Sequence, residues 1–120
     1  MLSHKTVENL AKLLEKNERV LLFDALCERV KFLGERTKAR IAERIAIETK
    51  MDKTQVYRYL NKKAIPNPKT TARVINALLK LGSFETVVKI LEPAAQRMTR
   101  TSRNFYRWKK RLVKNGIIYY

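Results

Sequence analysis

The amino-acid sequence predicts an all-α fold, a compact multi-helix bundle with a basic helix near its C-terminal end. Apolar residues recur every three or four positions along most of the 120 residues, which is the period of an amphipathic helix. Glycine and proline are scarce, with 3 of each, and most of them separate the periodic segments. With 45% hydrophobic residues the chain can bury a core. We expect a helical domain over residues 1–92 and a basic helical extension over 93–120.

Two helices are expected in the first 33 residues. An apolar stripe that begins at Val7 predicts a helix over about residues 4–16, and a denser stripe predicts a second helix over 18–33. The denser stripe consists of Val20, Leu21, Phe23, Leu26, Cys27, Val30 and Phe32 or Leu33. Gly34 suits the left-handed residue that follows a helix end, so the next helix is expected to begin near Glu35.

The middle of the chain predicts a short helix between two turns. Asp52 is followed three residues later by Gln55, which is the spacing of a capping box, and this predicts a helix from Lys53 to about residues 60–62. Pro66 and Pro68 then disfavour helix, because each restricts the residue before it to extended geometry. A further helix is expected from about residue 70 to residue 82.

The last third of the sequence predicts more helix. A segment near residues 84–98 comes first, and Pro93 is expected to break it or to lie in the first turn of a new helix. A capped helix from about Ser102 to Lys114 and a short β-like tail over residues 117–120 complete the prediction.

The formal charge of the chain is +16, from 27 basic and 11 acidic side chains. Residues 1–60 hold 13 basic and 9 acidic groups, whereas residues 61–120 hold 14 and 2. Such an excess repels itself unless a polyanion or salt compensates it, so we expect a nucleic acid as partner. An anionic membrane surface and a purely solubilising role are the alternatives. No apolar run approaches the roughly 20 residues of a membrane span, so the expected location is the cytoplasm, at the nucleoid, with no membrane partner.

The residue types of catalytic and metal sites are sparse in this sequence. His4 is the single histidine, and the acids are scattered. Cys27 is the single cysteine, which excludes an internal disulfide and favours a buried apolar position. There is no glycine-rich phosphate loop. We therefore expect no enzymatic activity, no metal and no cofactor.

The triplet RIA occurs twice, at residues 40–42 and 44–46. A compact helix-turn-helix needs a small residue where its helices cross, an apolar residue in the turn and apolar contacts in the second helix. Counted from the first copy, Val56 lies about one helical turn too far along the chain. Counted from the second copy, Met51 falls in the turn, and Val56 and Tyr59 follow at the required spacing. We expect the second copy to belong to the motif and the first to lengthen its helix.

In this register the stretch IAIETKMDKTQVYRYLN resembles the helix-turn-helix of the phage-repressor family, the lambda repressor and Cro-like DNA-binding domains. The similarity covers about residues 36–82, with the motif itself at about 37–62. It extends into NKKAIPNPKTTARVINALLKLG, where that family commonly has a basic loop, a proline and an amphipathic helix ending at glycine. Two positions depart from the pattern, since Lys50 stands where glycine is usual and Thr49 where an aliphatic residue is common.

The resemblance implies that residues 53–62 form a recognition helix in the major groove. The periodicity of the sequence independently places Val56, Tyr59 and Leu60 on an inner face and leaves the opposite face to solvent. The expected base contacts are Lys53, Thr54, Gln55, Tyr57 and Arg58. The alternative is an ordinary solvated helix face.

The expected phosphate contacts are basic and polar residues around this helix and in the C-terminal extension. They are Lys38, Arg44, Asn61, Lys62, Lys63, Lys69, Thr70, Arg103, Arg107, Arg111 and Lys114. In the extension, these cations share a helix with an apolar stripe of Phe105, Trp108 and Leu112. We expect the extension to be a second DNA contact; a partner-binding helix and a solubilising segment are the alternatives.

These patterns predict a sequence-specific double-stranded DNA-binding protein. We expect a transcriptional regulator of repressor type that acts as a homodimer on a pseudo-palindrome. The alternatives are an architectural, plasmid-partition or RNA-associated protein with little base recognition, and the DNA-binding part of a recombinase.

Overall fold

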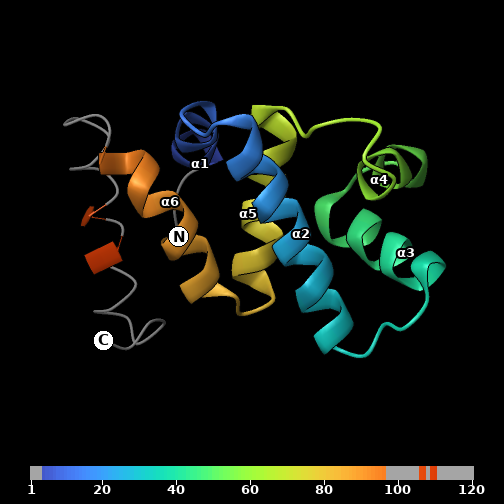
Figure 1. Cartoon of the computed structure of the whole chain (residues 1–120). Coiled ribbons are helices and arrows are strands. Elements are labelled where there is room, and N and C mark those ends of the chain that lie inside the picture. Colours follow the sequence, from blue (N-terminus) through green and yellow to red (C-terminus); the bar gives the residue numbers. More distant parts are fainter. Residues whose placement is uncertain (1–3, 97–105, 108, 111–120) are drawn as a thin grey trace.

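The computed structural model describes residues 4–96, 106, 107, 109 and 110, and over the continuous range it consists of six helices joined by short turns (Figure 1). They are α1 (His4–Lys12), α2 (Lys16–Phe32), α3 (Lys38–Thr49), α4 (Lys53–Leu60), α5 (Pro68–Lys80) and α6 (Phe84–Gln96). The described residues contain no strand. The predicted all-α class is confirmed, whereas the predicted β-like tail lies outside the described residues.

Helix α5 is the centre of the molecule. It packs against α1, α2, α3 and α6, while α4 is held mainly by α3. Helices α3 and α4 therefore lie together at one end of the bundle, and α1 and α6 lie toward the other end (Figure 1). Leu22 and Leu26 of α2 and Ile75 and Leu78 of α5 are fully buried where these two helices meet the rest of the core. Helix α1 buries its own apolar side chains in this core, Val7 among them.

Several predicted helix limits need correction, because residues before each helix cap it. Helix α3 begins at Lys38 and not near Glu35, since the Thr37 side chain accepts a hydrogen bond from the Arg40 N–H. Helix α5 begins at Pro68, two residues before the expected position. There Asn67 Oδ1 accepts from the Thr70 N–H over 2.8 Å, and proline is well tolerated in a first helical turn.

Two more limits also differ from expectation at the N-terminal hairpin. Helix α1 ends at Lys12, four residues earlier than predicted, and α2 begins at Lys16. The Glu15 N–H, just before α2, donates to the Glu18 side chain over 2.8 Å. This contact is one half of a capping box, which explains the earlier start of α2.

Pro93 lies inside α6 and neither breaks it nor opens a new helix. Helix α6 continues to Gln96, so the expected domain limit at residues 92/93 falls within a helix. Because Pro93 stands in the last four residues of α6, the backbone hydrogen bond that it cannot donate is lost only near the helix end.

The expected apolar stripe of α2 is buried only in part. Leu21 is 53% exposed, Phe32 is 77% exposed and Leu33 is 41% exposed. Helices α3, α5 and α6 contact α2, but together they leave these three side chains at the surface. The guanidinium carbon of Arg29 lies 5.1 Å from the centre of the Phe32 ring, which gives this exposed ring a cation–π contact.

Among the described residues, the structure contains no helix that is long and apolar enough to cross a membrane.

Candidate nucleic-acid interface

Helices α3 and α4 are joined by three residues, Lys50, Met51 and Asp52. The N–H of Met51 donates to the Ala46 carbonyl over 3.1 Å, and Lys50 adopts the left-handed conformation with φ +56°. This arrangement is a Schellman motif, and its left-handed position favours glycine. The turn therefore has the backbone geometry for which a glycine is usual, although the residue is a lysine.

Both copies of the RIA triplet lie in α3. Ile41 and Ala42 of the first copy are buried, as is Ile45 of the second, and Ala46 is half-buried. The first copy thus lengthens the helix, as expected. Thr49, which follows them, is 2% exposed, and its hydroxyl donates to the Ile45 carbonyl over 2.6 Å. That bond satisfies the hydroxyl and explains how threonine is accommodated among apolar side chains.

The predicted start of α4 at Lys53 is confirmed, but the cap differs from the expected capping box. Asp52 Oδ1 accepts from the Thr54 N–H over 3.3 Å. The Gln55 side chain does not return to Asp52; its Nε2 donates to the Tyr59 hydroxyl over 2.7 Å. Gln55 lies one turn from Tyr59 on the same side of the helix, so the side chain has a closer partner toward the C-terminal end of α4.

The inner face of α4 is anchored by Val56 and Tyr59. Val56 is fully buried and Tyr59 is 3% exposed. The Tyr59 ring meets Phe23 of α2 edge-on, with 5.4 Å between ring centroids. Leu60, also expected on this face, is half-buried and packs against the core. The inner face of α4 is therefore as predicted, and its anchors fix which side of the helix points outward.

The five expected base-contacting residues differ in exposure. Lys53, Thr54 and Arg58 are exposed, whereas Gln55 and Tyr57 are half-buried. Tyr57 packs in part against the core, and Gln55 is hydrogen-bonded as described above. The first turn of α4 and Arg58 therefore form the accessible part of this face.

Around the C-terminal end of α4, two of the expected phosphate contacts touch each other. Lys38 Nζ, at the start of α3, donates to Oδ1 of Asn61, which caps α4. This contact joins the first turn of α3 to the end of α4. Lys63, which follows in the turn, is exposed, and its N–H donates to the Arg58 carbonyl over 2.9 Å.

Lys62 is engaged elsewhere. It is left-handed with φ +58°, and its Nζ lies 2.7 Å from Asp24 Oδ1 on α2. Helix α4 ends at Leu60, which is the lower limit of the predicted range. The side chains of Lys62 and Asp24 are 61% and 46% exposed, so this ion pair is a surface contact and contributes little to stability.

At the start of α5, Lys69 is exposed and Thr70 is half-buried. The Thr70 N–H already donates to Asn67, so this amide is part of the helix cap. Lys69 is thus the accessible cation beside this helix N-terminus.

Arg44 takes part in an ion-pair chain between α3 and α5. Its Nε donates to Glu48 Oε1 over 3.1 Å, and Lys80 Nζ lies 3.3 Å from Glu48 Oε2. The Glu48 side chain is only 9% exposed. Oε2 forms no well-aligned hydrogen bond, so its compensation by Lys80 is electrostatic. Arg44 is therefore less available for a phosphate than its position in the sequence indicates.

Two further cations, Lys50 and Arg73, lie at the α3–α4 turn, and neither was among the expected DNA contacts. Arg73 of α5 donates from Nη1 to the Lys50 carbonyl over 3.4 Å. A hollow of about 260 Å³ lies beside this contact, lined by Glu48, Thr49, Lys50, Arg73 and Asn76. The signal for Lys50 was present in the sequence, as a lysine at a position that favours glycine. Arg73 gave no such signal, because its place depends on how α5 packs.

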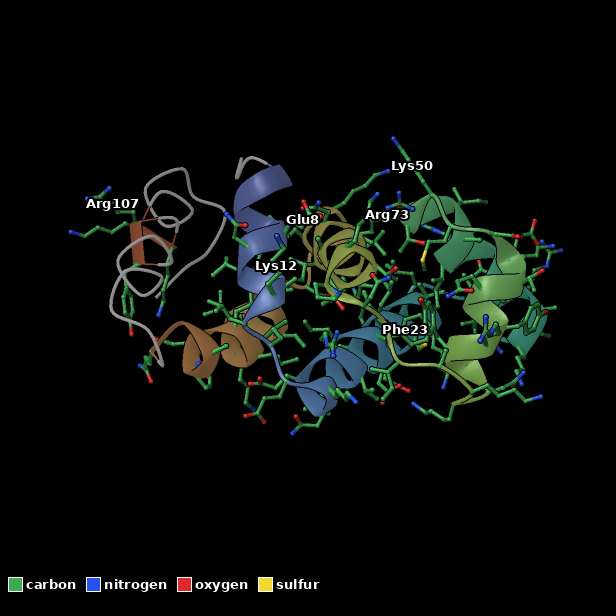
Figure 2. All side chains as sticks on the ribbon, turned by 90° about the horizontal axis from the view of Figure 1, so that it is seen from above. Glu8, Lys12, Phe23, Lys50, Arg73 and Arg107 are labelled. Carbon is green, nitrogen blue, oxygen red and sulfur yellow. The ribbon has the colours of Figure 1, made fainter. Side chains whose placement is uncertain are left out.

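In the C-terminal extension, Arg107 is exposed and lies at the end of the molecule opposite to α3 and α4 (Figure 2). Arg103, Arg111 and Lys114 lie outside the described residues. Lys109 Nζ lies 3.4 Å from Glu92 Oε1, which connects the extension to α6.

Other site chemistry is limited in the described part of the chain. No group of three or more histidine, cysteine, aspartate or glutamate side chains there could hold a metal ion. Burial, and then the charge of Asp24, raises the pKa of the Cys27 thiol from 9.0 to about 11, which leaves it protonated at neutral pH.

Comparison of the chain with protein-family models, with curated proteins and with solved structures found no match.

Proposed function

We propose that this protein binds double-stranded DNA in a sequence-specific manner, as a transcriptional regulator that inserts α4 into the major groove. The observation that carries the proposal is the division of α4 into an anchored face and an accessible face. Val56 and Tyr59 hold one face in the core, while Lys53, Thr54 and Arg58 are exposed on the other. A short helix presented in this way has the shape and the side chains that recognise base edges.

The charge around α4 supports a polyanionic partner. Between Arg36 and Arg73 the chain has 11 basic and 3 acidic residues. Of the three acids, Glu48 is paired with Arg44 and Lys80, whereas Asp52, which caps α4, and Glu43 are exposed, so the cations exceed the exposed acids several-fold. The excess of cations supplies the salt-dependent attraction on which DNA binding depends.

Selection of bound sequences from a random pool of duplexes tests the proposal. At about 150 mM salt we expect a defined consensus, and a two-fold symmetric one if two copies bind together. A pool that returns no consensus contradicts sequence-specific binding.

The variant Arg58→Gln tests the part played by α4. It should weaken binding to the selected site by about 1–3 kcal/mol and relax the base preference at one position. Lys89→Gln is the matched control, because Lys89 is an exposed cation on α6, away from α4 (Figure 1). If both variants changed the affinity for every DNA sequence by the same amount, α4 would not take part in base recognition.

A second candidate is an architectural protein that binds DNA with little base recognition. One observation favours it: Gln55, whose amide suits an adenine edge, is half-buried, and one of its two N–H groups is committed to Tyr59. In that case the pool returns no consensus, while a random duplex still binds with a steep dependence on salt.

A further inference from the structure

Four helices of this protein end in the same backbone hydrogen-bond pattern. After α2, α3, α4 and α5, one residue is left-handed and the N–H of the next residue bonds to a carbonyl five positions earlier. The left-handed residues are Gly34, Lys50, Lys62 and Gly82. Glycine adopts this conformation without steric conflict, whereas a side chain with a Cβ atom does so at a cost in stability. The two lysines flank α4. The left-handed positions occupied by a residue other than glycine are therefore those next to the candidate interface.

Lys62 has a compensating partner within the fold, since its ammonium pairs with Asp24 at 2.7 Å. Lys50 does not share this feature. Within the described residues no acceptor pairs with its ammonium, and the side chain extends away from the body of the molecule (Figure 2). Lys50 therefore adopts a strained backbone conformation although its ammonium forms no stabilising interaction within the described part of the chain. Such a residue points to a role in binding and not in folding.

Arg73 adds a second cation at the same place. Its guanidinium is held against the turn by the bond to the Lys50 carbonyl, on one side of the hollow of about 260 Å³. Glu48 is the acid in this lining, and its charge is compensated by Arg44 at 3.1 Å and Lys80 at 3.3 Å. The hollow therefore offers two cationic groups and the Asn76 side chain, with no uncompensated negative charge among its lining residues.

The position of this pair relative to α4 suits a duplex. Lys50 lies at the N-terminal end of α4, and the exposed Lys63 lies just past its C-terminal end. A helix of eight residues is about 12 Å long, and the major groove is about 12 Å wide. The length of α4 is thus similar to the width of the groove whose two sides are bordered by phosphate backbones.

We propose that Lys50 and Arg73 form a phosphate-contacting site at the N-terminal end of α4, which holds one backbone of a DNA duplex while Lys63 faces the other. This inference rests on the proposed function and deepens it, because it assigns a phosphate contact to the turn between α3 and α4. At the left-handed position of that turn, glycine would be more stable than lysine.

Salt-dependent binding of the full chain to a duplex of about 20 base pairs of random sequence tests the site. Lys50→Gly should reduce the slope of log affinity against log salt by about 0.9, equivalent to roughly fivefold weaker binding at about 0.15 M salt. Its melting temperature should rise above that of the wild type, because the turn is relieved of strain. Lys50→Arg should keep the wild-type slope, since it keeps the charge. Arg73→Gln should reduce the slope by a similar amount.

Two controls separate the possible failures. Lys89→Gln removes an exposed cation on α6 and should leave the slope almost unchanged. Lys62→Gly removes a left-handed lysine whose charge is already paired, so its slope should fall less than that of Lys50→Gly. If Lys50→Gly binds with the wild-type slope while Arg58→Gln weakens binding, the turn site is wrong and the proposed function stands. If the wild-type chain binds no duplex, the proposed function and this site are both wrong.

Discussion

The side-chain amide of Gln55 donates a hydrogen bond from Nε2 to the hydroxyl of Tyr59 over 2.7 Å. Tyr59 is a core residue whose ring packs edge-on against Phe23, so the bond connects the candidate recognition face of α4 to the interior. An amide held in this way has fewer orientations to lose when it meets a base edge. The remaining N–H and the carbonyl oxygen of Gln55 are the groups that an adenine would use.

Tyr59→Phe tests this connection, because it keeps the ring and removes only the hydroxyl. We expect the free energy of unfolding to fall by about 0.5–1.5 kcal/mol, the usual net value of one hydrogen bond. On the selected site, preference for the base that Gln55 contacts should fall, while affinity for random duplex should not change. Urea denaturation and competition binding measure the two effects. Retention of the full base preference in Tyr59→Phe would contradict the connection.

Asp24 of α2 restrains Lys62, one of the expected phosphate contacts, at 2.7 Å. In Asp24→Asn the lysine loses its charged partner and becomes available to DNA, so affinity for random duplex should rise and the salt slope should steepen by up to about 0.9. Stability should change by less than about 1 kcal/mol, because both side chains are well exposed.

Glu28→Gln is the matched control for this change. It removes one acid from the same helix, and the acid it removes is also paired with an exposed lysine, Lys31, at 3.2 Å. A general effect of net charge would move both variants equally. Equal salt slopes for Asp24→Asn and Glu28→Gln would therefore show that Lys62 does not reach phosphate.

Much of the fold follows from local signals that are present in the sequence. Asp52 marks the start of α4, Gly34 marks the left-handed residue after α2, and the spacing of Val56 and Tyr59 gives the inner face of α4. Each of these signals acts over a few residues, where hydrogen bonds and helical period decide the outcome. This is why the order and type of the helices could be predicted.

The sequence could not show which cations are paired within the fold, because their partners lie far along the chain. Lys62 meets Asp24 across 38 positions, and Lys38 meets Asn61 across 23. Such contacts depend on how the helices pack, which the charge pattern does not contain. The exposed side chains of α2 have the same origin, since the apolar pattern could not show that Phe32 would be left uncovered by the helices that pack on α2.

Burial of Cys27 makes stability depend on pH in a defined window. Its pKa is raised from 9.0 to about 11 in the folded protein, so the unfolded chain loses this proton first as the pH rises. The stabilising contribution is complete below pH 9 and is lost progressively as the pH approaches 11. We expect the difference in unfolding free energy between wild type and Cys27→Ala to shrink over this range. Urea denaturation of both proteins at several pH values measures it, and comparison of the two removes the titration of lysine and tyrosine. A constant difference would show that the thiol titrates normally.

Arg107 lies at the opposite end of the molecule from α4, and the longest dimension of the protein is 39 Å (Figure 2). That distance corresponds to about 11 base pairs of straight duplex. A duplex of fewer base pairs than this that occupies α4 therefore does not extend to Arg107, and a DNA contact of the extension would involve a second duplex or a distant part of a longer one.

The double variant Arg107→Gln with Lys110→Gln separates these cases, because both side chains are exposed cations of the extension. On a duplex of about 8 base pairs, which is shorter than the protein, we expect the salt slope of one-to-one binding to equal that of the wild type. Bridging between two differently labelled short duplexes, measured by energy transfer, should decrease, because the second DNA contact is weakened. Lys109→Gln is the control within the same segment, since Lys109 is already paired with Glu92 at 3.4 Å. A fall of about 0.9 in the one-to-one slope would mean that a single short duplex touches both ends of the protein. Unchanged bridging would mean that Arg107 and Lys110 contact no DNA.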